Sequence, residues 1–302
     1  MIIDILMATY NGEKYIEAQL LSLQSQTYKE WNLLIHDDGS TDNTVEIIQK
    51  YAKLDHRITF ICDENHHLGA SMNFMNLLKY STSDFIMFCD QDDIWLEDKI
   101  EKMLFEIKNK NNSIPQLVYS KAYLLYNSHV INDTVLFAEV SSLSNLLFLN
   151  GGILGCTIIC NKKLLSYCLD YSGYVSMHDV LLCLVASALG EISYISDRLI
   201  LYRQHENNVT GNVSSSFFKK IKTFFKRDKV VIRRKYYLTV EGFYKHFGKD
   251  MSSINKDIIN SYLSFPKKNI FSRITLVYKY KFKIFDSITI LFIKILFRKP
   301  IN

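Results

Sequence analysis

The sequence predicts an α/β fold built around a doubly wound, mostly parallel sheet. Four short apolar runs alternate with helical patterns, and polar residues follow each run. Short apolar runs bounded by polar turns are typical of buried parallel strands, and their alternation with helices indicates βαβ units. With 302 residues, of which 48% are hydrophobic, the chain can bury a large core.

The expected strands and helices alternate along the first part of the chain. The strands are predicted at residues 3–9, 31–37, 58–63 and 84–90, and the helices at residues 15–24, 44–53 and 70–80. The strand segments are rich in Ile, Leu and Phe, which suits strands covered by helices on both faces.

The charge of the chain is divided between two segments. Residues 1–211 carry 15 Lys and Arg against 26 Asp and Glu, whereas residues 212–302 carry 21 against 5. Such an asymmetry indicates different roles for the two segments. We therefore expect a globular domain at residues 1–211 and a basic, aromatic-rich helical tail at residues 212–302.

Cysteine usage and hydropathy predict a cytoplasmic protein. The six cysteines are scattered through apolar stretches without CxxC pairs, so we expect reduced, buried thiols. The N-terminus lacks the basic segment of a cleaved secretory signal. No stretch reaches the roughly 18 to 20 uninterrupted apolar residues that a membrane-spanning helix needs.

Polar residues follow all four predicted strands at their carboxyl ends, where ligands bind in open α/β sheets. Any single strand end could be a helix cap or a turn, because Asp, Asn, Ser and Gly favour both. Four such ends together with a triple carboxylate favour one acidic binding cleft. The strand-end residues are Thr9, Tyr10, Asn11 and Gly12; Asp37, Asp38, Gly39 and Ser40; Asp63, Glu64 and Asn65; and Asp90, Gln91, Asp92 and Asp93.

The stretch FCDQDDIW, residues 88–95, predicts a metal site. Asp90, Asp92 and Asp93 directly follow an apolar run, and a carboxylate withdrawn from water needs a cation or hydrogen-bond donors. One Asp alone could cap the helix that follows, but three point to a metal ion. Neither GxGxxG after the first strand nor a P-loop sequence is present, so the sequence does not support a dinucleotide-binding or P-loop site.

Six segments carry a resemblance to a known family. They are ATYNGEKYIEAQLLSLQSQT, DDGSTDNT, NHHLGASMNF, FCDQDDIW, MHDVLLCLVASALG and LYRQHENNVTG, in this order. Together they resemble the inverting glycosyltransferases of family 2, which have a GT-A fold, and in particular the rhamnosyltransferase-like enzymes of bacterial surface polysaccharide synthesis. The resemblance covers residues 1–211.

The resemblance implies a donor site for a nucleotide-diphosphate sugar, linked to dTDP or UDP. Asp90 and Asp92 match the family's DxD motif, in which Asp92 would bind the metal directly and Asp93 would position the metal or the sugar. A divalent cation would stabilise the charge that develops on the diphosphate, and Mn²⁺ or Mg²⁺ suits carboxylate ligands. The other residues expected on the donor side are Thr9, Tyr10, Asn11, Asp37, Asp38, Asn65, Gly69, Asn73 and Gln91.

The same resemblance assigns a base and an acceptor side. Inversion in one displacement requires that the acceptor hydroxyl lose its proton as it attacks, and Asp179 matches the family's base position. Asp179 could also cap the helix that follows it, and both roles can hold together. His205 is expected as a metal or diphosphate contact, with Arg203 as the cationic alternative. Asn150, Gly155 and His178 are expected near the donor sugar or the acceptor.

The basic tail predicts contact with an anionic membrane. Residues 214–237 interleave phenylalanines with lysines and arginines, and residues 276–297 form a second amphipathic segment. An interfacial helix needs this pattern, with its apolar side in the lipid and its cations among the head groups. The alternative is a helical appendage that packs on the body. A nucleic-acid partner is not expected, because no RNA- or DNA-binding module is recognisable.

We therefore expect a metal-dependent, inverting glycosyltransferase of cell-surface polysaccharide synthesis. It would transfer a sugar, with rhamnose as one candidate, to a saccharide or lipid-linked acceptor at the cytoplasmic face of the inner membrane. Two alternatives remain open at this point. A nucleotidyltransferase could use a similar sheet and metal site, and a non-catalytic protein could bind a nucleotide-sugar as a sensor or scaffold.

Overall fold

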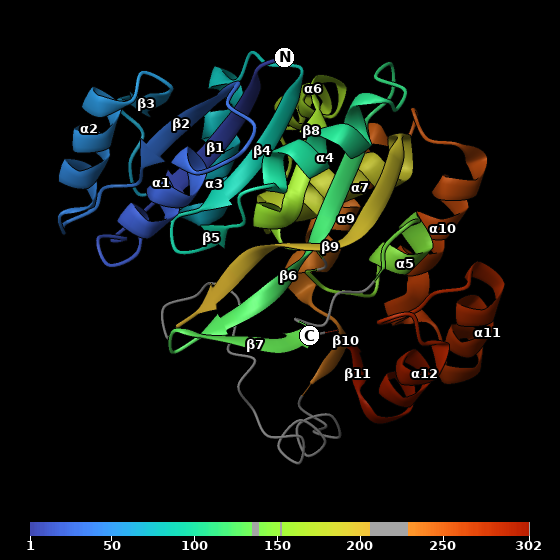
Figure 1. The fold of residues 1–302 in the computed structure, drawn as a ribbon. Helices are drawn as coiled ribbons and strands as arrows, with labels where there is room; N and C mark the ends of the chain where they lie inside the picture. Colours follow the sequence, from blue (N-terminus) through green and yellow to red (C-terminus); the bar gives the residue numbers. More distant parts are fainter. Residues whose placement is uncertain (135–138, 152, 206–228, 302) are drawn as a thin grey trace.

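One mixed sheet runs through the body of the protein (Figure 1). The computed structural model describes residues 1–134, 139–151, 153–205 and 229–301. Within these residues the main sheet has nine strands, in the order β3-β2-β1-β4-β8-β6-β9-β5, with β7 paired to β6. The expected α/β class is therefore confirmed, and the sheet is mixed because its second half contains antiparallel strands.

The first half of the sheet is the predicted parallel unit. It contains β1 (Ile3–Thr9), β2 (Trp31–Asp37), β3 (Ile58–Ile61) and β4 (Phe85–Asp90). The register pairs Thr9 with Asp37 and Ala8 with Asp90, so the three central strands end at the same level. The helices that follow the first three strands are α1 (Ile16–Gln24), α2 (Thr44–Leu54) and α3 (Gly69–Leu77). Each lies within two residues of its predicted start.

The second half of the sheet brings a distant segment to the acidic loop. It contains β5 (Ile94–Trp95), β6 (Gln116–Tyr126), β7 (His129–Thr134), β8 (Ile158–Asn161) and β9 (Glu191–Gln204). The short strand β5 pairs antiparallel with β9, with Ile94 opposite Leu201. This pairing places the residues just before β5 beside the carboxyl end of β9.

Two hydrophobic clusters cover the two faces of the sheet. On β4, Phe85, Met87 and Cys89 enter one cluster with α1, α2 and α4 (Lys99–Lys108). Ile86 and Phe88 enter the other cluster with α3, α6 (Lys162–Asp170) and α7 (His178–Leu189). This alternation follows from the two-residue period of a strand, and it directs Asp90 toward the side that carries α7.

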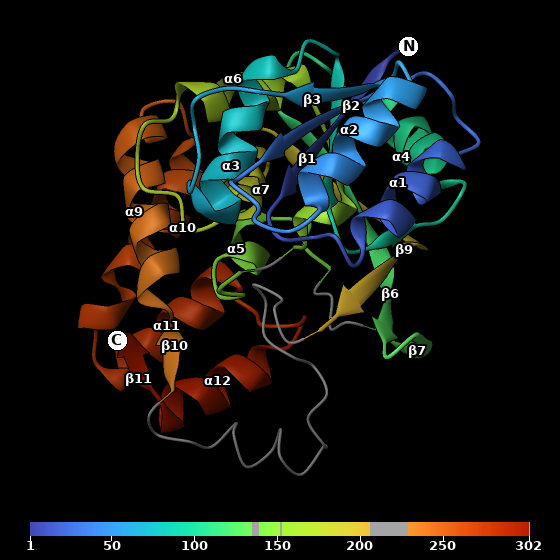
Figure 2. The ribbon, with the colours of Figure 1, turned by 90° about the vertical axis from the view of Figure 1, so that its left-hand side faces the viewer.

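The C-terminal helices pack on the α7 side of the body (Figure 2). They are α9 (Arg234–Phe247), α10 (Ser253–Ser264), α11 (Ile270–Tyr280) and α12 (Ile288–Phe297), with the parallel strands β10 (Val230–Ile232) and β11 (Lys299–Ile301). Val240, Phe243 and Tyr262 are fully buried in the same cluster as α7. The described part of the tail thus shares the core of the body, whereas residues 206–228, which hold most of the first basic segment, lie outside the described residues. A domain boundary at residue 211 stays a prediction.

The remaining expectations concern cysteines and membrane spans. All six cysteines are free, and five are buried as expected, whereas Cys62 is exposed. Among the described helices, none has the length and apolarity to cross a bilayer.

Candidate active site

The carboxyl ends of β1 and β2 are joined through Asp37. The Thr9 hydroxyl donates to Asp37 Oδ2 over 2.7 Å, and the Ser40 hydroxyl donates to the same oxygen over 2.7 Å. The backbone N–H groups of Gly39 and Ser40 donate to Asp37 Oδ1. The buried Asp37 therefore shapes the turn after β2, and its expected place on the donor side stays a prediction.

Asp38 holds the start of α3. Its Oδ1 accepts from the Leu68 N–H over 2.7 Å, and its Oδ2 accepts from the Gly69 N–H over 2.8 Å. A carboxylate at a helix N-terminus satisfies N–H groups that the helix leaves unpaired. Gly69 has a φ of +74°, and no atom lies within 4 Å of the position that a Cβ would occupy. The backbone there is open on the cleft side, as a close approach to a ligand would require.

Gln91 ties the acidic loop to the end of β1. The Tyr10 N–H donates to Gln91 Oε1, and Gln91 Nε2 donates to the Tyr10 carbonyl, both over 2.9 Å. A Cβ on Gly12 would lie 2.3 Å from Gln91 Oε1, so this pairing requires glycine at position 12. The Tyr10 side chain is 51% exposed at the carboxyl end of β1, where its ring is accessible to a ligand.

Two of the predicted donor-side asparagines lie in the loops around the cleft. Asn11 has a φ of 46°, and its Oδ1 accepts from the Thr41 N–H over 2.9 Å. Asn65 is exposed, and its backbone N–H donates to Asp63 Oδ1 over 2.8 Å. Asn11 thus helps to fix the loop after β1, and Asn65 helps to fix the loop after β3.

The third predicted asparagine, Asn73, is buried behind the cleft. Its Oδ1 lies 2.7 Å from His36 Nδ1, and its Nδ2 donates to the His36 carbonyl over 3.2 Å. His36 Nε2 lies 3.0 Å from Asp63 Oδ1. Both polar atoms of the Asn73 side chain are therefore engaged in a network that braces β2 against α3, so a donor contact would require this network to rearrange.

Asp92 meets His205 from the far end of the sheet. Their Oδ2 and Nε2 atoms lie 2.7 Å apart. The His205 ring stacks on Tyr15 with a centroid distance of 4.8 Å, and the Arg203 guanidinium lies 4.9 Å from the same Tyr15 ring. Arg203 Nε donates to the Asp92 carbonyl over 2.7 Å, which anchors the acidic loop to the end of β9.

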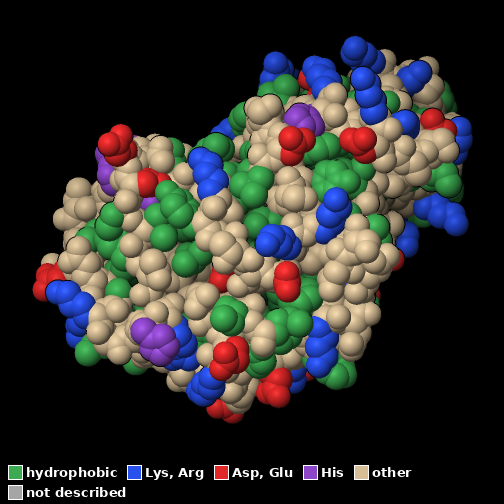
Figure 3. All heavy atoms as spheres, turned by 90° about the horizontal axis from the view of Figure 1, so that it is seen from above, with side chains coloured by type: hydrophobic (Ala, Val, Ile, Leu, Met, Phe, Trp, Pro, Cys, Tyr) green, Lys and Arg blue, Asp and Glu red, His purple; other side chains and the backbone are tan. Residues whose placement is uncertain are grey.

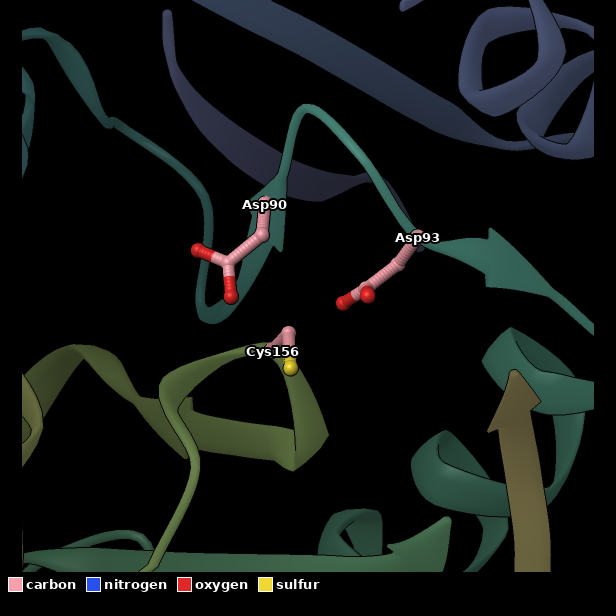
Figure 4. A group of neighbouring side chains, drawn as sticks. All are labelled: Asp90, Asp93 and Cys156. Carbon is pink, nitrogen blue, oxygen red and sulfur yellow. The ribbon is translucent and has the colours of Figure 1, made fainter. Parts of the chain in front are cut away.

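Asp90, Asp93 and Cys156 form a group of neighbouring side chains, in which Asp90 is half-buried and the other two are buried (Figure 4). One ligand atom from each lies within 4.8 Å of the others. Asp93 is fully buried, its Oδ1 accepts from the Arg203 N–H over 2.9 Å, and its Oδ2 has no hydrogen-bond partner. Burial and the charge of Asp92 raise the pKa values of both Asp90 and Asp93. Asp93 therefore acts as an internal support of the loop, out of reach of solvent.

Lys99 is a functional candidate that the sequence analysis missed. It is fully buried at the start of α4, its Nζ donates to the Cys156 carbonyl, and Nζ lies 3.5 Å from the Trp95 ring centroid. Burial lowers the pKa of Lys99 to about 8, while Asp90 and Asp93 oppose the shift. A lysine in the first turn of a helix interacts unfavourably with the helix dipole. This unusual position of Lys99 was the sequence feature that could have pointed to a special role.

Asp179 reaches the acidic group from the first turn of α7. It is buried, and its Oδ1 has no hydrogen-bond partner. Burial raises the pKa of Asp179 to about 7, the backbone N–H groups of Val180 and Gly155 oppose this rise, and the charge of Asp90 adds to it. A carboxylate with a pKa near neutrality and an unused oxygen has the properties of a general base.

His178, next to Asp179, is enclosed by aromatic rings. Its ring lies 4.1 Å from Phe74 and 5.4 Å from Phe88, centroid to centroid. Neither ring nitrogen has a hydrogen-bond partner, and a Cβ on Gly155 would lie 2.5 Å from Nε2. Burial lowers the pKa of His178 to about 3, so this imidazole is neutral. Gly155 is thus needed where η2 (Gly155–Thr157) passes close to His178.

Asn150 connects the segment before η2 to the C-terminal part. Its Nδ2 donates to the Val231 carbonyl over 2.8 Å, and its Oδ1 accepts from the Arg233 N–H over 2.7 Å. The Asn150 side chain therefore pairs with one carbonyl of β10 and with the N–H group just after this strand, as a neighbouring strand would. Its predicted position near the acceptor stays a prediction.

The family is decided by a match over the first half of the chain. A model described as Glycosyl transferase family 2 matches residues 4–158, which include the whole acidic loop. This protein is a member of glycosyl transferase family 2. The membership shows that the protein is a glycosyltransferase, and it sets aside the nucleotidyltransferase and the non-catalytic binding protein.

This glycosyltransferase is similar to two curated relatives and to one solved structure. It is 33% identical to the dTDP-rhamnosyl transferase RfbG of Shigella flexneri over 69% of this chain and 75% of the relative. It is 31% identical to the UDP-Glc:alpha-D-GlcNAc-diphosphoundecaprenol beta-1,3-glucosyltransferase WfgD of Escherichia coli over 73% of this chain and 83% of the relative. The mannosyltransferase PcManGT of Pyrobaculum calidifontis, solved with GDP-Man and Mn²⁺, aligns with a TM-score of 0.55 at 12% identity over 91% of this chain and 73% of that chain. This last likeness supports the GT-A-like fold.

The donor set of this glycosyltransferase fits a divalent cation. Asp92 Oδ2 and His205 Nε2 share a hydrogen bond over 2.7 Å, and both a carboxylate and a neutral imidazole can bind a divalent cation. Asp90 is a further carboxylate on the same loop, and its charge acts together with that of Asp92. Cys156 and the fully buried Asp93 suit a hard cation poorly, because the thiol is a soft ligand and Asp93 is out of reach of solvent.

Proposed function

We propose that this glycosyltransferase transfers a sugar from a nucleotide-diphosphate donor to an acceptor hydroxyl with inversion at the anomeric carbon. The observation that carries the proposal is the position of Asp179. It is a buried carboxylate with an unused oxygen and a pKa raised to about 7, and the charge of Asp90 in the acidic loop acts on it. A base so close to the proposed leaving-group site suits a single displacement, in which attack and departure occur on opposite sides of one carbon.

The donor would lie along the carboxyl ends of β1, β2 and β4. The exposed Tyr10 ring offers a flat apolar surface to a nucleobase, and Asp37 and Asp38 offer acceptor oxygens to base N–H or ribose hydroxyl groups. The open backbone at Gly69 leaves room for the diphosphate or the sugar. These contacts would orient the donor so that its anomeric carbon faces Asp179.

Asp92 and His205, with Asp90, would hold Mn²⁺ or Mg²⁺. The cation would supply Lewis-acid stabilisation of the negative charge that develops on the leaving diphosphate. The Mn²⁺ found with a structural relative supports this assignment. Arg203 and Tyr15 would keep His205 in place, because both contact the acidic loop or the imidazole directly.

Asp179 would take the proton of the attacking hydroxyl. The Val180 and Gly155 backbone N–H groups keep one side of its carboxylate fixed, so Oδ1 would be the oxygen that accepts the proton. The neutral His178 beside it is enclosed by Phe74 and Phe88 and would form part of the apolar support of Asp179.

The relatives suggest the substrates. A dTDP-rhamnosyl transferase and a UDP-glucose-dependent transferase to a diphosphoundecaprenol acceptor support dTDP- or UDP-linked donors and a lipid-linked saccharide acceptor. Such an activity belongs to the synthesis of a cell-surface polysaccharide. Rhamnose is the first donor sugar to test.

The experiment is a screen of the purified full chain against dTDP-rhamnose, UDP-glucose and other nucleotide-sugars, with a lipid-diphosphate-linked saccharide as acceptor. Reactions contain Mn²⁺, Mg²⁺ or EDTA. We expect transfer from one donor class, loss of transfer in EDTA, and a product whose anomeric configuration by NMR is opposite to that of the donor. Retention of configuration would overturn the proposed mechanism, and undiminished transfer in EDTA would overturn the metal assignment.

A further inference from the structure

Helix α12 is apolar on all sides but buries little of itself. Its sequence, ITILFIKILF, contains one charged residue, Lys294. Only Leu291 and Ile295 are buried, whereas Leu296 and Phe297 are 56% and 47% exposed. A helix that is hydrophobic all round is normally enclosed by protein or lipid. Ile288, Ile290 and Phe292 pack partly against the core, so the apolar surface that α12 leaves exposed lies at Leu296 and Phe297.

The exposed apolar surface continues onto α11. Phe271, 79% exposed, and Tyr278, 64% exposed, are seven residues apart and share one face of that helix. The Tyr278 ring lies 4.9 Å from the Phe292 ring of α12, centroid to centroid. Phe292 and Leu296 are four residues apart on α12 and share a face. These four residues form one stripe across both helices, which we call the α11–α12 stripe.

Cations border this stripe. Residues 265–301 contain nine Lys and Arg and a single acidic residue, Asp286. Lys267, Lys268, Lys279, Lys281 and Lys299 are exposed. Figure 3 shows the upper face of the molecule, away from α11 and α12, where Lys and Arg side chains also gather on the lobe at the upper right.

A second group of cations gathers around Lys294. Its Nζ lies 5.9 Å from the Phe285 ring centroid, and among the described residues it has no hydrogen-bond or carboxylate partner. Burial lowers the pKa of Lys294 to about 8, and Arg298, Arg233 and Lys229 act in the same direction. The charged groups that act on Lys294 are therefore all positive. Like charges are unfavourable when they are brought together, so the group is suited to an anion.

We propose that α11, α12 and the flanks of β10 form a docking surface for an anionic lipid membrane. The α11–α12 stripe would enter the boundary between head groups and acyl chains, and Lys229, Arg233 and Lys294 would lie among the lipid phosphates. Charge complementarity decides for this occupant, because an exposed aromatic stripe bordered by cations matches a bilayer whose surface is negative and whose interior is apolar. A protein partner for the same surface would need, on its own surface, an apolar groove lined with acidic groups.

The docking surface lies at the end of the molecule that carries α11, α12, β10 and β11 (Figure 2). Asn150, on the segment leading to Gly155 and the candidate base, binds the backbone beside Arg233. Membrane contact at β10 is thus connected by one side chain to the acceptor side of the active site. The proposal does not depend on which sugar is transferred.

The charge part of the proposal is tested by sedimentation of the full chain with vesicles. One vesicle is phosphatidylcholine alone, and the other contains 30% phosphatidylglycerol. We expect the wild type to bind only the anionic vesicles. The variant Lys229→Gln/Arg233→Gln/Lys294→Gln should bind them roughly 100-fold more weakly, since each cation near an anionic surface contributes about a fivefold factor.

A matched control removes three cations from the body. Lys53→Gln/Lys108→Gln/Lys110→Gln carries the same net charge as the test variant but leaves the docking surface intact. We expect it to retain binding within about twofold. Equal losses in both variants, or equal wild-type binding to neutral vesicles, would overturn the proposal. Inorganic phosphate at millimolar concentration should compete poorly, and full competition would identify a soluble phosphate as the ligand instead of the membrane.

The insertion part is tested by tryptophan fluorescence. The native Trp31 and Trp95 are buried, so a tryptophan introduced on the surface dominates any change. Phe271→Trp should show a blue shift with anionic vesicles and protection from a soluble quencher. Phe105→Trp, at an exposed position of α4, should show neither. A blue shift of Phe271→Trp that rises with protein concentration without vesicles would show a second copy as the occupant and overturn the proposal.

Discussion

Asp92 Oδ2 and His205 Nε2 lie 2.7 Å apart although 113 residues separate them in the chain. The contact exists because β5 directly follows the acidic loop and pairs with β9. Ile94 lies opposite Leu201, four residues before His205. Tyr15, from the start of α1, then stacks on the imidazole. Three chain segments thus meet at one pair of candidate metal-binding atoms, and the pair is the first target for mutation.

Replacement of Asp92 by Asn should abolish transfer. The variant keeps the shape of the side chain but loses the charge that would bind the cation, so we expect the initial rate to fall at least 1000-fold, in line with several kcal/mol of lost charge stabilisation. Asp98→Asn, which removes an exposed partner of Lys102, is the matched control and should keep its rate within twofold. A rate for Asp92→Asn near that of the control would exclude Asp92 as a ligand.

Replacement of His205 by Ala should weaken the binding of the metal more than it weakens the binding of the donor. We expect the Mn²⁺ concentration for half-maximal activity to rise roughly tenfold to 100-fold, the range typical when a supporting or weak ligand is lost. Activity is measured across a Mn²⁺ titration at saturating donor. His246→Ala, at a surface ion pair with Asp170, should leave the titration unchanged. An unaltered Mn²⁺ dependence in His205→Ala would assign the imidazole to another role.

Asp179→Asn should remove the base without removing donor binding. General-base catalysis typically contributes 100-fold to 10,000-fold, so kcat should fall by about that factor while the Kd of the donor changes less than threefold. Calorimetry gives the donor affinity, and initial rates give kcat. Asp170→Asn on the surface is the control, and a parallel fall of kcat and affinity would point to a structural role of Asp179.

Gly12→Ala should raise the KM of the donor by displacing Gln91. The new Cβ would lie 2.3 Å from Gln91 Oε1, so the pairing with Tyr10 would break and the mouth of the cleft would loosen. We expect about a tenfold rise in KM. In a Gln91→Ala background the obstacle is absent, so the same substitution should add little. Additive effects in the double variant would show that Gly12 acts elsewhere.

His178 should make the protein sensitive to acid. Burial lowers the pKa of His178 from 6.5 to about 3. Between these two pH values the imidazole is protonated in the unfolded chain and neutral in the folded chain. The stability it permits is complete above about pH 6.5 and is lost as the pH falls toward 3. Between pH 7 and pH 5 this costs about 2 kcal/mol. In His178→Leu, urea unfolding at the two pH values should show a loss smaller by that amount, and an equal loss in both proteins would contradict the assignment.

The parallel half of the sheet was predictable because each strand carries its own local pattern. Residues 3–9 and 31–37 were predicted to the residue, since apolar runs that end in polar turns are read directly from the sequence. The strands β6, β8 and β9 were not predicted. Their pairing depends on segments far apart in the chain, and their mixed directions leave no local signal.

The chain alone determined the identity of the acidic loop. Asp90, Asp92 and Asp93 stand within four residues, and their density after an apolar run predicts a metal-binding loop from the sequence alone. Only the tertiary structure decided how the three differ. Asp92 meets His205, Asp93 is fully buried with an unpaired oxygen, and Lys99 lies beneath them. Burial and charge at a side chain depend on all the segments that surround it, and no local pattern records where those segments come to lie.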